Sequence, residues 1–146
     1  MDIVGGAVAS LCEVLREAVV TTAGSHSVNL LFDHETDAVR VDVSPAGGDV
    51  TTTVQTPAPL WIRLPTWADR SELTVRGAAN YKIPRDHVLV AEPPIGKPVR
   101  VSYPVPESEI ALRHRTREIR ARLRGDSVVA MDDFGAALTF FEPIGG

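Results

Sequence analysis

Pro-Leu-Trp-Ile-Arg-Leu-Pro-Thr-Trp-Ala, residues 59–68, is the stretch that decides the fold. Apolar side chains occupy every second position of its first half, with larger or charged ones between them: Leu60, Ile62 and Leu64, then Trp61 and Arg63. A period of two is typical of a strand whose faces meet different surroundings. Pro65 has no backbone donor and fixes φ, so the strand must end there, and Thr66 and Trp67 enter a turn.

The same period of two continues from residue 28 to the end of the chain. Glycines and prolines, eleven of each in the sequence, separate the apolar runs as turn residues do. This spacing predicts a mainly β protein, an antiparallel β-sandwich of about 10–11 short strands. The strands are expected at Val28–Phe32, Val39–Val43, Val50–Gln55, Leu60–Leu64, Glu72–Arg76, His87–Ala91, Val99–Tyr103, Glu109–Arg113, Glu118–Leu123, Val128–Met131 and Ala137–Phe141.

The first residues follow a helical period instead. Apolar or small side chains recur at spacings of three, four and seven, namely Val4, Val8, Leu11, Cys12, Leu15, Ala18 and Val19. We expect one amphipathic helix that ends before Gly24 and has Glu13, Arg16 and Glu17 on its polar face. The predicted organisation is therefore a helical segment at residues 1–24, which needs a surface to pack on, and a sandwich at residues 25–146.

Composition excludes several classes of protein. At 146 residues, with 44% hydrophobic residues and a net charge of -4, the chain fits one globular domain rather than a disordered one. It has no apolar run near the roughly 20 residues that span a bilayer, and its start does not resemble a signal peptide, so we expect no membrane partner and a cytoplasmic location. Cys12, the only cysteine, cannot form an internal disulfide; within the apolar stripe it reads as a buried small hydrophobe.

A basic segment stands out against the acidic remainder. Residues 113–124 carry one glutamate and six arginines, Arg113, Arg115, Arg117, Arg120, Arg122 and Arg124. Their alternation predicts one sheet face covered by guanidinium groups. Because no aromatic residue lies between Tyr103 and Phe134, we expect no nucleic-acid binding, and favour an ion-pair interface with another domain or subunit over a solvated sheet face.

Two further groups could carry chemistry. Trp61 and Trp67 could form a flat platform for a sugar ring, although in a chain with only eight aromatic residues a structural role is the stronger interpretation. Asp33, His34 and Glu35 could hold a catalytic or metal site, but their spacing matches no specific ligand motif and favours a solvated turn. We therefore predict no metal, no cofactor and no catalytic residue.

Leu60–Ala68 resembles the "L-R-[IL]-P-[ST]-W-A" signature in the β-sandwich part of glycoside hydrolase family 127, the β-L-arabinofuranosidase-like enzymes. Other segments resemble that family in the same order: Gly5–Val19 its last barrel helix, Val28–Phe32 its "V-N-L" strand, Ser71–Gly77 and Tyr81–Val90 its next strands, and Ile119–Leu138 its basic strand and hairpin.

The resemblance implies a lineage more than an activity. Members of the family join an (α/α)-barrel catalytic domain, with a zinc-held cysteine nucleophile, to β-sandwich domains, whereas the family's cysteine pair would fall at or before residues 1–4, where this sequence has none. We therefore expect a non-catalytic accessory domain with a structural or assembly role, whose partner is a helical barrel or a second copy bound through the N-terminal helix. A stand-alone carbohydrate-binding module using Trp61 and Trp67 is the alternative.

Overall fold

The computed structural model describes residues 3–44, 46–114 and 117–132. One helix precedes the strands, which confirms the mainly β class with a single N-terminal helix. The elements are α1 (Ile3–Ala18), β1 (Val19–Thr21), β2 (His26–Val28), β3 (His34–Glu35), β4 (Val39–Ser44), β5 (Asp49–Val54), β6 (Leu60–Arg63), β7 (Thr74–Arg76), β8 (His87–Val90), β9 (Pro98–Ser102), β10 (Glu107–His114), β11 (Arg117–Arg124) and β12 (Ser127–Met131). The strand expected at Ala137–Phe141 lies outside the described residues.

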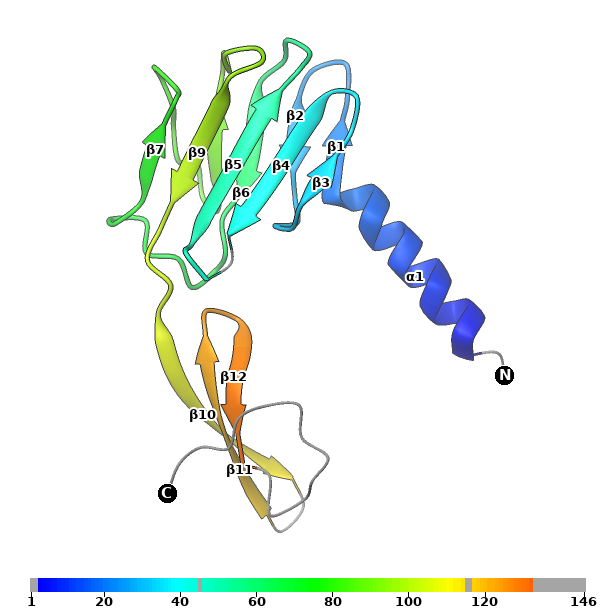
Figure 1. Cartoon of the computed structure of the whole chain (residues 1–146), viewed down its shortest axis with the longest axis vertical. Coiled ribbons are helices and arrows are strands. Elements are labelled where there is room, and N and C mark those ends of the chain that lie inside the picture. The colour runs from blue at the N-terminus through cyan, green and yellow to red at the C-terminus, as the bar shows by residue number, and fades with distance from the viewer. Residues whose placement is uncertain (1–2, 45, 115–116, 133–146) are drawn as a thin grey trace.

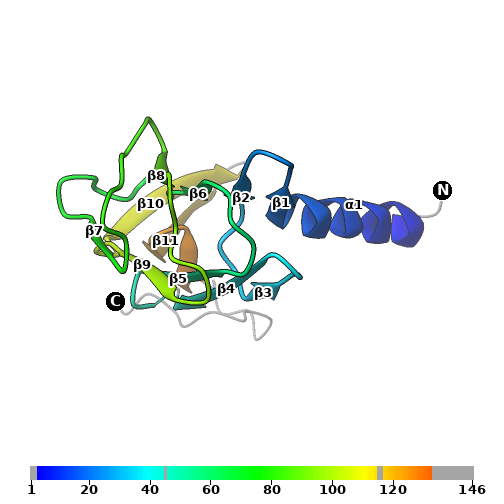
Figure 2. The same ribbon diagram turned by 90° about the horizontal axis from the view of Figure 1, so that it is seen from above.

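Two sheets form the sandwich. One has the strand order β1-β2-β6-β8 and the other β3-β4-β5-β9-β7, and Figure 2 shows them as two layers seen edge-on. Their inward positions alternate with exposed ones, as the period of two predicted. The core between the layers consists mainly of fully buried branched side chains, among them Val28, Leu60, Ile62, Val88, Val41, Val50 and Val99.

The helix is shorter than the sequence indicated. It ends at Ala18, and Val19–Thr21 forms β1, which pairs with β2 and places Val19 in the sandwich core. The physical reason is that Val19, Val20 and Thr21 are all β-branched, which favours a strand over a helix. Gly24, which we expected to stop the helix, lies in the hairpin between β1 and β2 instead.

The next strand also ends early. It was expected at Val28–Phe32, but β2 stops at Val28, because the backbone N–H groups of Asn29 and Leu30 both donate to the carbonyl oxygen of Ala18, at 2.9 and 3.3 Å. Asn29 and Leu30 therefore bond to the last residue of α1 instead of to a neighbouring strand. His34 and Glu35 follow in β3, a short edge strand paired with β4, rather than in a turn.

Two elements extend from the sandwich on the same side of the molecule (Figure 1). Helix α1 projects away from β1, and the three-stranded sheet β10-β11-β12 lies beyond the end of β9. This last sheet is a meander of neighbouring strands, and the backbone N–H of Gly125 in its β11–β12 turn donates to the carbonyl of Pro106 at 2.8 Å. The sandwich end between these two extensions carries the candidate site.

Candidate functional site

The proline corner after β6 positions the second tryptophan. Pro65 ends the ladder as expected, and the N–H of Leu64 donates to the carbonyl of Asp86 at 2.7 Å. The N–H of Ala68 then donates to the carbonyl of Pro65 at 3.1 Å, which closes a turn around Trp67. This turn directs Trp67 toward the junction of the sandwich and the β10-β11-β12 sheet.

Trp67 is half-buried at that junction. Its ring meets the ring of Tyr103 edge-on, with centroids 5.6 Å apart, and its six-membered ring lies against the α-carbon of Gly125. The indole Nε1 is buried, and it has no hydrogen-bond partner among the residues that the structure describes. A buried donor without a partner costs about 1–3 kcal/mol, so packing of the ring must outweigh this loss.

A cavity of about 320 Å³ opens beside Trp67. Its apolar wall includes Leu30, Leu64 and Pro65. Polar residues line it from separate parts of the chain, among them Asn29 after β2, Arg63 at the end of β6 and Asp126 in the β11–β12 turn. A smaller cavity of about 90 Å³ shares Pro65, Trp67 and Asp126. An apolar hollow with a few converging polar groups has the general character of a ligand site.

Trp61 has different surroundings from Trp67. It points away from the core on β6, opposite Ser27 of β2 and Leu89 of β8, and its half-buried ring meets the ring of His87 edge-on at 6.1 Å. The two cavities described above are lined by Trp67 and not by Trp61. Sugar binding by Trp61 and Trp67 together stays a prediction.

The acidic and histidine residues lie along the β3 edge. Asp33 accepts the backbone N–H of Val43 at 2.7 Å, and the ring of His34 meets that of Phe32 edge-on at 5.8 Å. Arg40 binds Asp42 through two nitrogens, and its pKa is raised by that hydrogen bond, by the charge of Asp42 and then by Glu35. Within the described ranges no three His, Cys, Asp or Glu side chains are placed to hold a metal ion.

The arginines divide between the faces of the C-terminal sheet, because alternation along β10 and β11 puts Arg113, Arg120, Arg122 and Arg124 on one face and Arg117 on the other. This differs from the single arginine face that the sequence suggested. Carboxylates oppose three of the arginines across the strands: Glu107 faces Arg124, Glu109 faces Arg122 and Glu118 faces Arg113. Such opposite-charge neighbours stabilise a sheet, which gives the arginines a role inside this chain. Arg115 lies outside the described residues.

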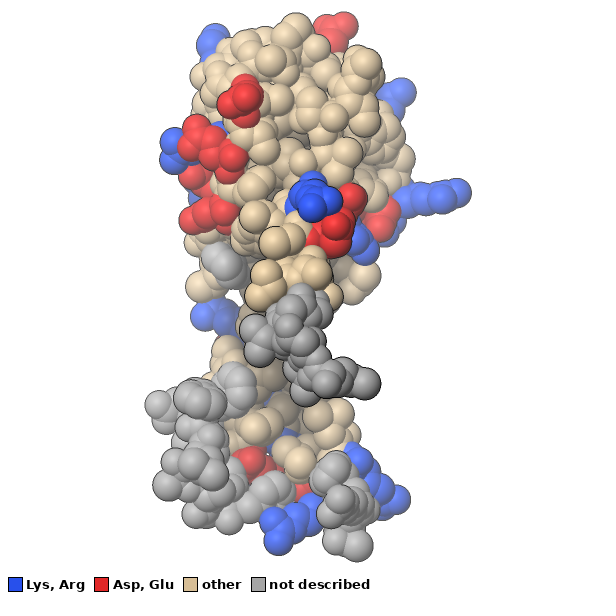
Figure 3. Space-filling view, turned by 90° about the vertical axis from the view of Figure 1, so that its right-hand side faces the viewer, with Lys and Arg blue, Asp and Glu red and all other residues tan. Residues whose placement is uncertain are grey.

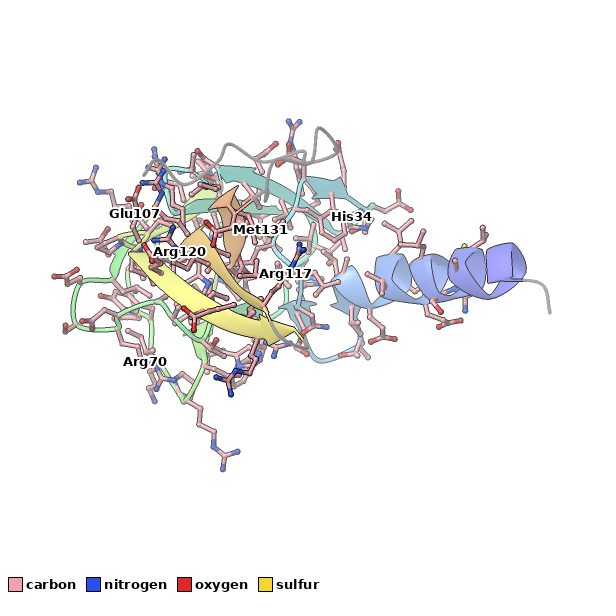
Figure 4. The ribbon with its side chains drawn as sticks, turned by 90° about the horizontal axis from the view of Figure 1, so that it is seen from below. His34, Arg70, Glu107, Arg117, Arg120 and Met131 are labelled. Atoms are coloured by element: carbon pink, nitrogen blue, oxygen red, sulfur yellow. The ribbon has the colours of Figure 1, made fainter. Side chains whose placement is uncertain are left out.

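Asp132 holds the adjoining strand to the same charged face. It accepts the backbone N–H of Arg120 at 2.8 Å and pairs with its guanidinium at 3.4 Å. The hydrogen bonds from Arg120 lower the pKa of Asp132, the backbone one most. Figure 4 shows Glu107, Arg120 and Met131 coming from the three strands of this sheet. An interface role for the six arginines stays a prediction.

Charges of both signs are interspersed on the sandwich face that Figure 3 shows. Another charged pair of the sandwich joins neighbouring strands: Asp49 on β5 accepts from Arg100 on β9 at 2.7 and 3.1 Å and from the Ser102 hydroxyl at 2.5 Å. These hydrogen bonds, that of Arg100 first, lower the pKa of Asp49. We expect no nucleic-acid binding because charges of both signs are mixed on this face and because the basic segment has no interleaved aromatic residues.

Helix α1 presents its apolar side chains to solvent. Leu11 is 67% exposed, and Val8 and Leu15 of the same stripe are about half exposed. Cys12 is exposed too, so the expectation of a buried cysteine is wrong. The reason is that α1 contacts the rest of the described chain mainly near its C-terminal end, at β1 and at Asn29 and Leu30 after β2. No helix among the described residues is long and apolar enough to cross a membrane.

Comparison with known proteins finds a similarity to a solved structure. No family model matches the chain, and no curated protein matches it. Among solved structures, a family 127 (GH127) β-L-arabinofuranosidase from Geobacillus stearothermophilus T6 is similar, with a TM-score of 0.53 and 22% sequence identity. The similarity covers 83% of this chain and 22% of the enzyme chain. It supports a GH127-like fold, and the chain corresponds to a small part of that enzyme.

Sequence reasoning missed most of the residues around the cavity. It singled out Trp67, but not Asn29, Arg63 or Asp126, which come together only through the sheet topology. Gly125 is one of the glycines that separate the predicted strands, and it is a contact of Trp67. Nothing in the spacing of the other residues marks them as neighbours.

Proposed function

We propose that this chain is a non-catalytic β-sandwich accessory domain of a glycoside hydrolase-like protein, with a role in structure or assembly. The observation that carries the proposal is the stripe on α1, where Val8, Leu11 and Leu15 are each at least 51% exposed. Contiguous exposed apolar side chains mark surfaces that contact another protein. The fold similarity to a small part of a GH127 β-L-arabinofuranosidase supports the same interpretation.

The partner that we propose for the stripe is a helical barrel domain, with a second copy of this chain as the competing occupant. A helix face with apolar residues spaced three and four apart packs well against other helices. Family 127 enzymes, which the sequence resembles, contain such a barrel. A cytoplasmic location and the absence of catalysis by the isolated chain are parts of the same proposal.

The decisive experiment is to read the frame upstream of this chain's gene and to produce its product together with this chain. We expect the frame to encode a helical barrel, and we expect the barrel and this chain to co-elute when they are produced together. Replacing Val8, Leu11 and Leu15 by serine should separate them, whereas the same number of serine substitutions at exposed Arg76, Arg85 and Lys97 should not. Arabinofuranosidase activity of the chain alone, or a monomer with no adjoining barrel, would contradict the proposal.

A further inference from the structure

We infer that the cavity beside Trp67 binds a neutral saccharide, through a site formed by Asn29, Arg63, Trp67 and Asp126. The inference goes beyond the proposed function, which concerns contacts with another protein. It also differs from a platform of two tryptophans, because one indole ring contributes and the remaining contacts are polar groups from other elements.

Three polar groups on the cavity wall have unused hydrogen-bonding capacity. Asn29 donates through Nδ2 to the carbonyl of Glu17 at 3.0 Å, and its Oδ1 accepts nothing from the described residues. The backbone hydrogen bond of Asp86 lowers the pKa of that carboxyl most, followed by His87 and then by the charge of Arg63. The guanidinium of Arg63 makes no ion pair within the described chain. The carboxylate of Asp126 also makes no ion pair within the described chain, and its charge contributes to the raised pKa of Tyr103.

These groups fit hydroxyls better than they fit an ion. A guanidinium only donates hydrogen bonds, whereas a carboxylate and an amide oxygen only accept them. A pair of neighbouring sugar hydroxyls can accept from Arg63 and donate to Asp126 or Asn29 at once. An anion would meet Asp126, and a cation would meet Arg63, so the opposed charges favour a ligand without net charge.

The remaining wall suits the C–H groups of a sugar ring. Leu30, Leu64, Pro65 and Trp67 supply apolar surface beside the polar groups. The volume of about 320 Å³ falls at the lower end of ligand sites, which span roughly 300–1,000 Å³. One sugar residue therefore occupies this cavity.

A neighbouring cavity gives the site room for a second unit. It measures about 440 Å³, shares Asn29, Leu30 and Arg63 with the first, and continues toward Glu13 and Glu17 of α1. Because these glutamates add negative charge, an acidic sugar is disfavoured there as well. The preferred ligand is thus a neutral oligosaccharide rather than a monosaccharide or a uronate.

The indole N–H signals of Trp61 and Trp67 in a ¹H–¹⁵N NMR spectrum provide the test. The two signals are assigned with Trp61→Phe and Trp67→Phe, and the whole chain is titrated separately with xylotriose, arabinotriose, galactotriose and, as the charged comparator, trigalacturonate. We expect at least one neutral trisaccharide to shift the Trp67 signal and to bind more tightly than its monosaccharide and than trigalacturonate.

Variants of the cavity wall then separate this site from others. Arg63→Gln and Asp126→Asn should each raise the Kd by about tenfold, the value of one charge-assisted hydrogen bond. Arg76→Gln, on exposed β7, should leave the Kd unchanged. The inference is overturned if no neutral trisaccharide shifts the Trp67 signal up to its solubility limit, if trigalacturonate binds most tightly, or if both wall variants, with otherwise unchanged spectra, bind as the original chain does.

Discussion

The six-membered ring of Trp67 lies so close to Gly125 that a Cβ at residue 125 would stand 2.7 Å from Cζ2 of the indole. This contact joins the proline corner of the sandwich to the β11–β12 turn of the C-terminal sheet. Gly125 also has a φ of 62°, a conformation that residues with a side chain adopt at a cost. Both facts require glycine at this position.

Three glycine-to-alanine variants separate these two effects. Gly24→Ala should be nearly neutral, because Gly24 has open space and no positive φ. Gly96→Ala should cost about 1 kcal/mol, since Gly96 has a φ of 67° but no neighbour within 4 Å. Gly125→Ala should cost about 2 kcal/mol or more, because strain and the clash with Trp67 add. Urea unfolding measures all three, and equal costs at residues 96 and 125 would show that the Trp67 contact can relax.

Ionisation of Tyr103 should lower the stability of the sandwich at alkaline pH. Burial first, and then the charges of Asp126 and Asp49, raise the pKa of Tyr103 from 10.0 to about 12. The unfolded chain loses this proton near pH 10 while the folded chain keeps it. The stability that neutral Tyr103 contributes is therefore fully present below pH 10 and is lost as the pH rises toward about 12.

Unfolding by urea at a series of alkaline pH values checks this dependence. The original chain should lose stability more steeply between pH 10 and 12 than Tyr103→Phe does, because the variant has no hydroxyl to ionise at residue 103. Absorbance of tyrosinate gives an independent measure of the Tyr103 pKa. Parallel pH profiles for the two proteins would mean that Tyr103 ionises equally well in the folded and unfolded chains.

The cross-strand charges of the C-terminal sheet predict a charge-swap result. Glu109 and Arg122 are directly opposite on β10 and β11. Glu109→Arg or Arg122→Glu alone places like charges opposite each other and should cost about 0.2–1 kcal/mol. The double swap restores the attraction and should recover most of that loss. Thermal unfolding of the four proteins at low and high salt tests it, and strictly additive effects would indicate that the pair does not interact.

The buried ring of His26 should be held in one orientation by hydrogen bonds at both nitrogens. It is 1% exposed, its Nε2 lies 2.8 Å from the carbonyl oxygen of Thr56, and its Nδ1 lies 3.1 Å from the Thr21 hydroxyl. Because a carbonyl only accepts, Nε2 carries a proton, and the Thr21 hydroxyl is the partner of Nδ1. Long-range ¹H–¹⁵N spectra of the imidazole report the tautomer directly.

Removing the hydroxyl partner of Nδ1 tests the same arrangement by stability. Thr21→Val should cost about 1–3 kcal/mol, because Nδ1 of the imidazole is left buried without a partner. Thr53→Val, at an outward position of β5, is the matched control and should change stability by about 0.5 kcal/mol or less. If both substitutions have the same small effect, the hydroxyl of Thr21 is not the partner that fixes the ring.

The sequence predicted correctly those elements that a local residue pattern determines. It did not predict features that depend on contacts between residues far apart in the chain. Leu60, Ile62 and Leu64 are buried as their alternation indicated. The end of α1 was misjudged because Val19 continues the helical spacing, whereas pairing with Val28 draws it into a strand. The cavity residues Asn29, Arg63 and Asp126 are separated by long stretches of chain, and only strand order brings them together.

The parallel pairing of β2 with β6 has a consequence for the order of folding. Residues 26–28 can form their parallel ladder only after residues 60–62 have been synthesised. The segment between them contributes β3, β4 and β5 to the opposite sheet. During synthesis the sandwich cannot close before Ser102, the last residue of β9, has left the ribosome, whereas β10, β11 and β12 need only their immediate neighbours. Helix α1 precedes all of these strands in the chain, so its apolar stripe is already exposed while the sandwich and the C-terminal sheet form.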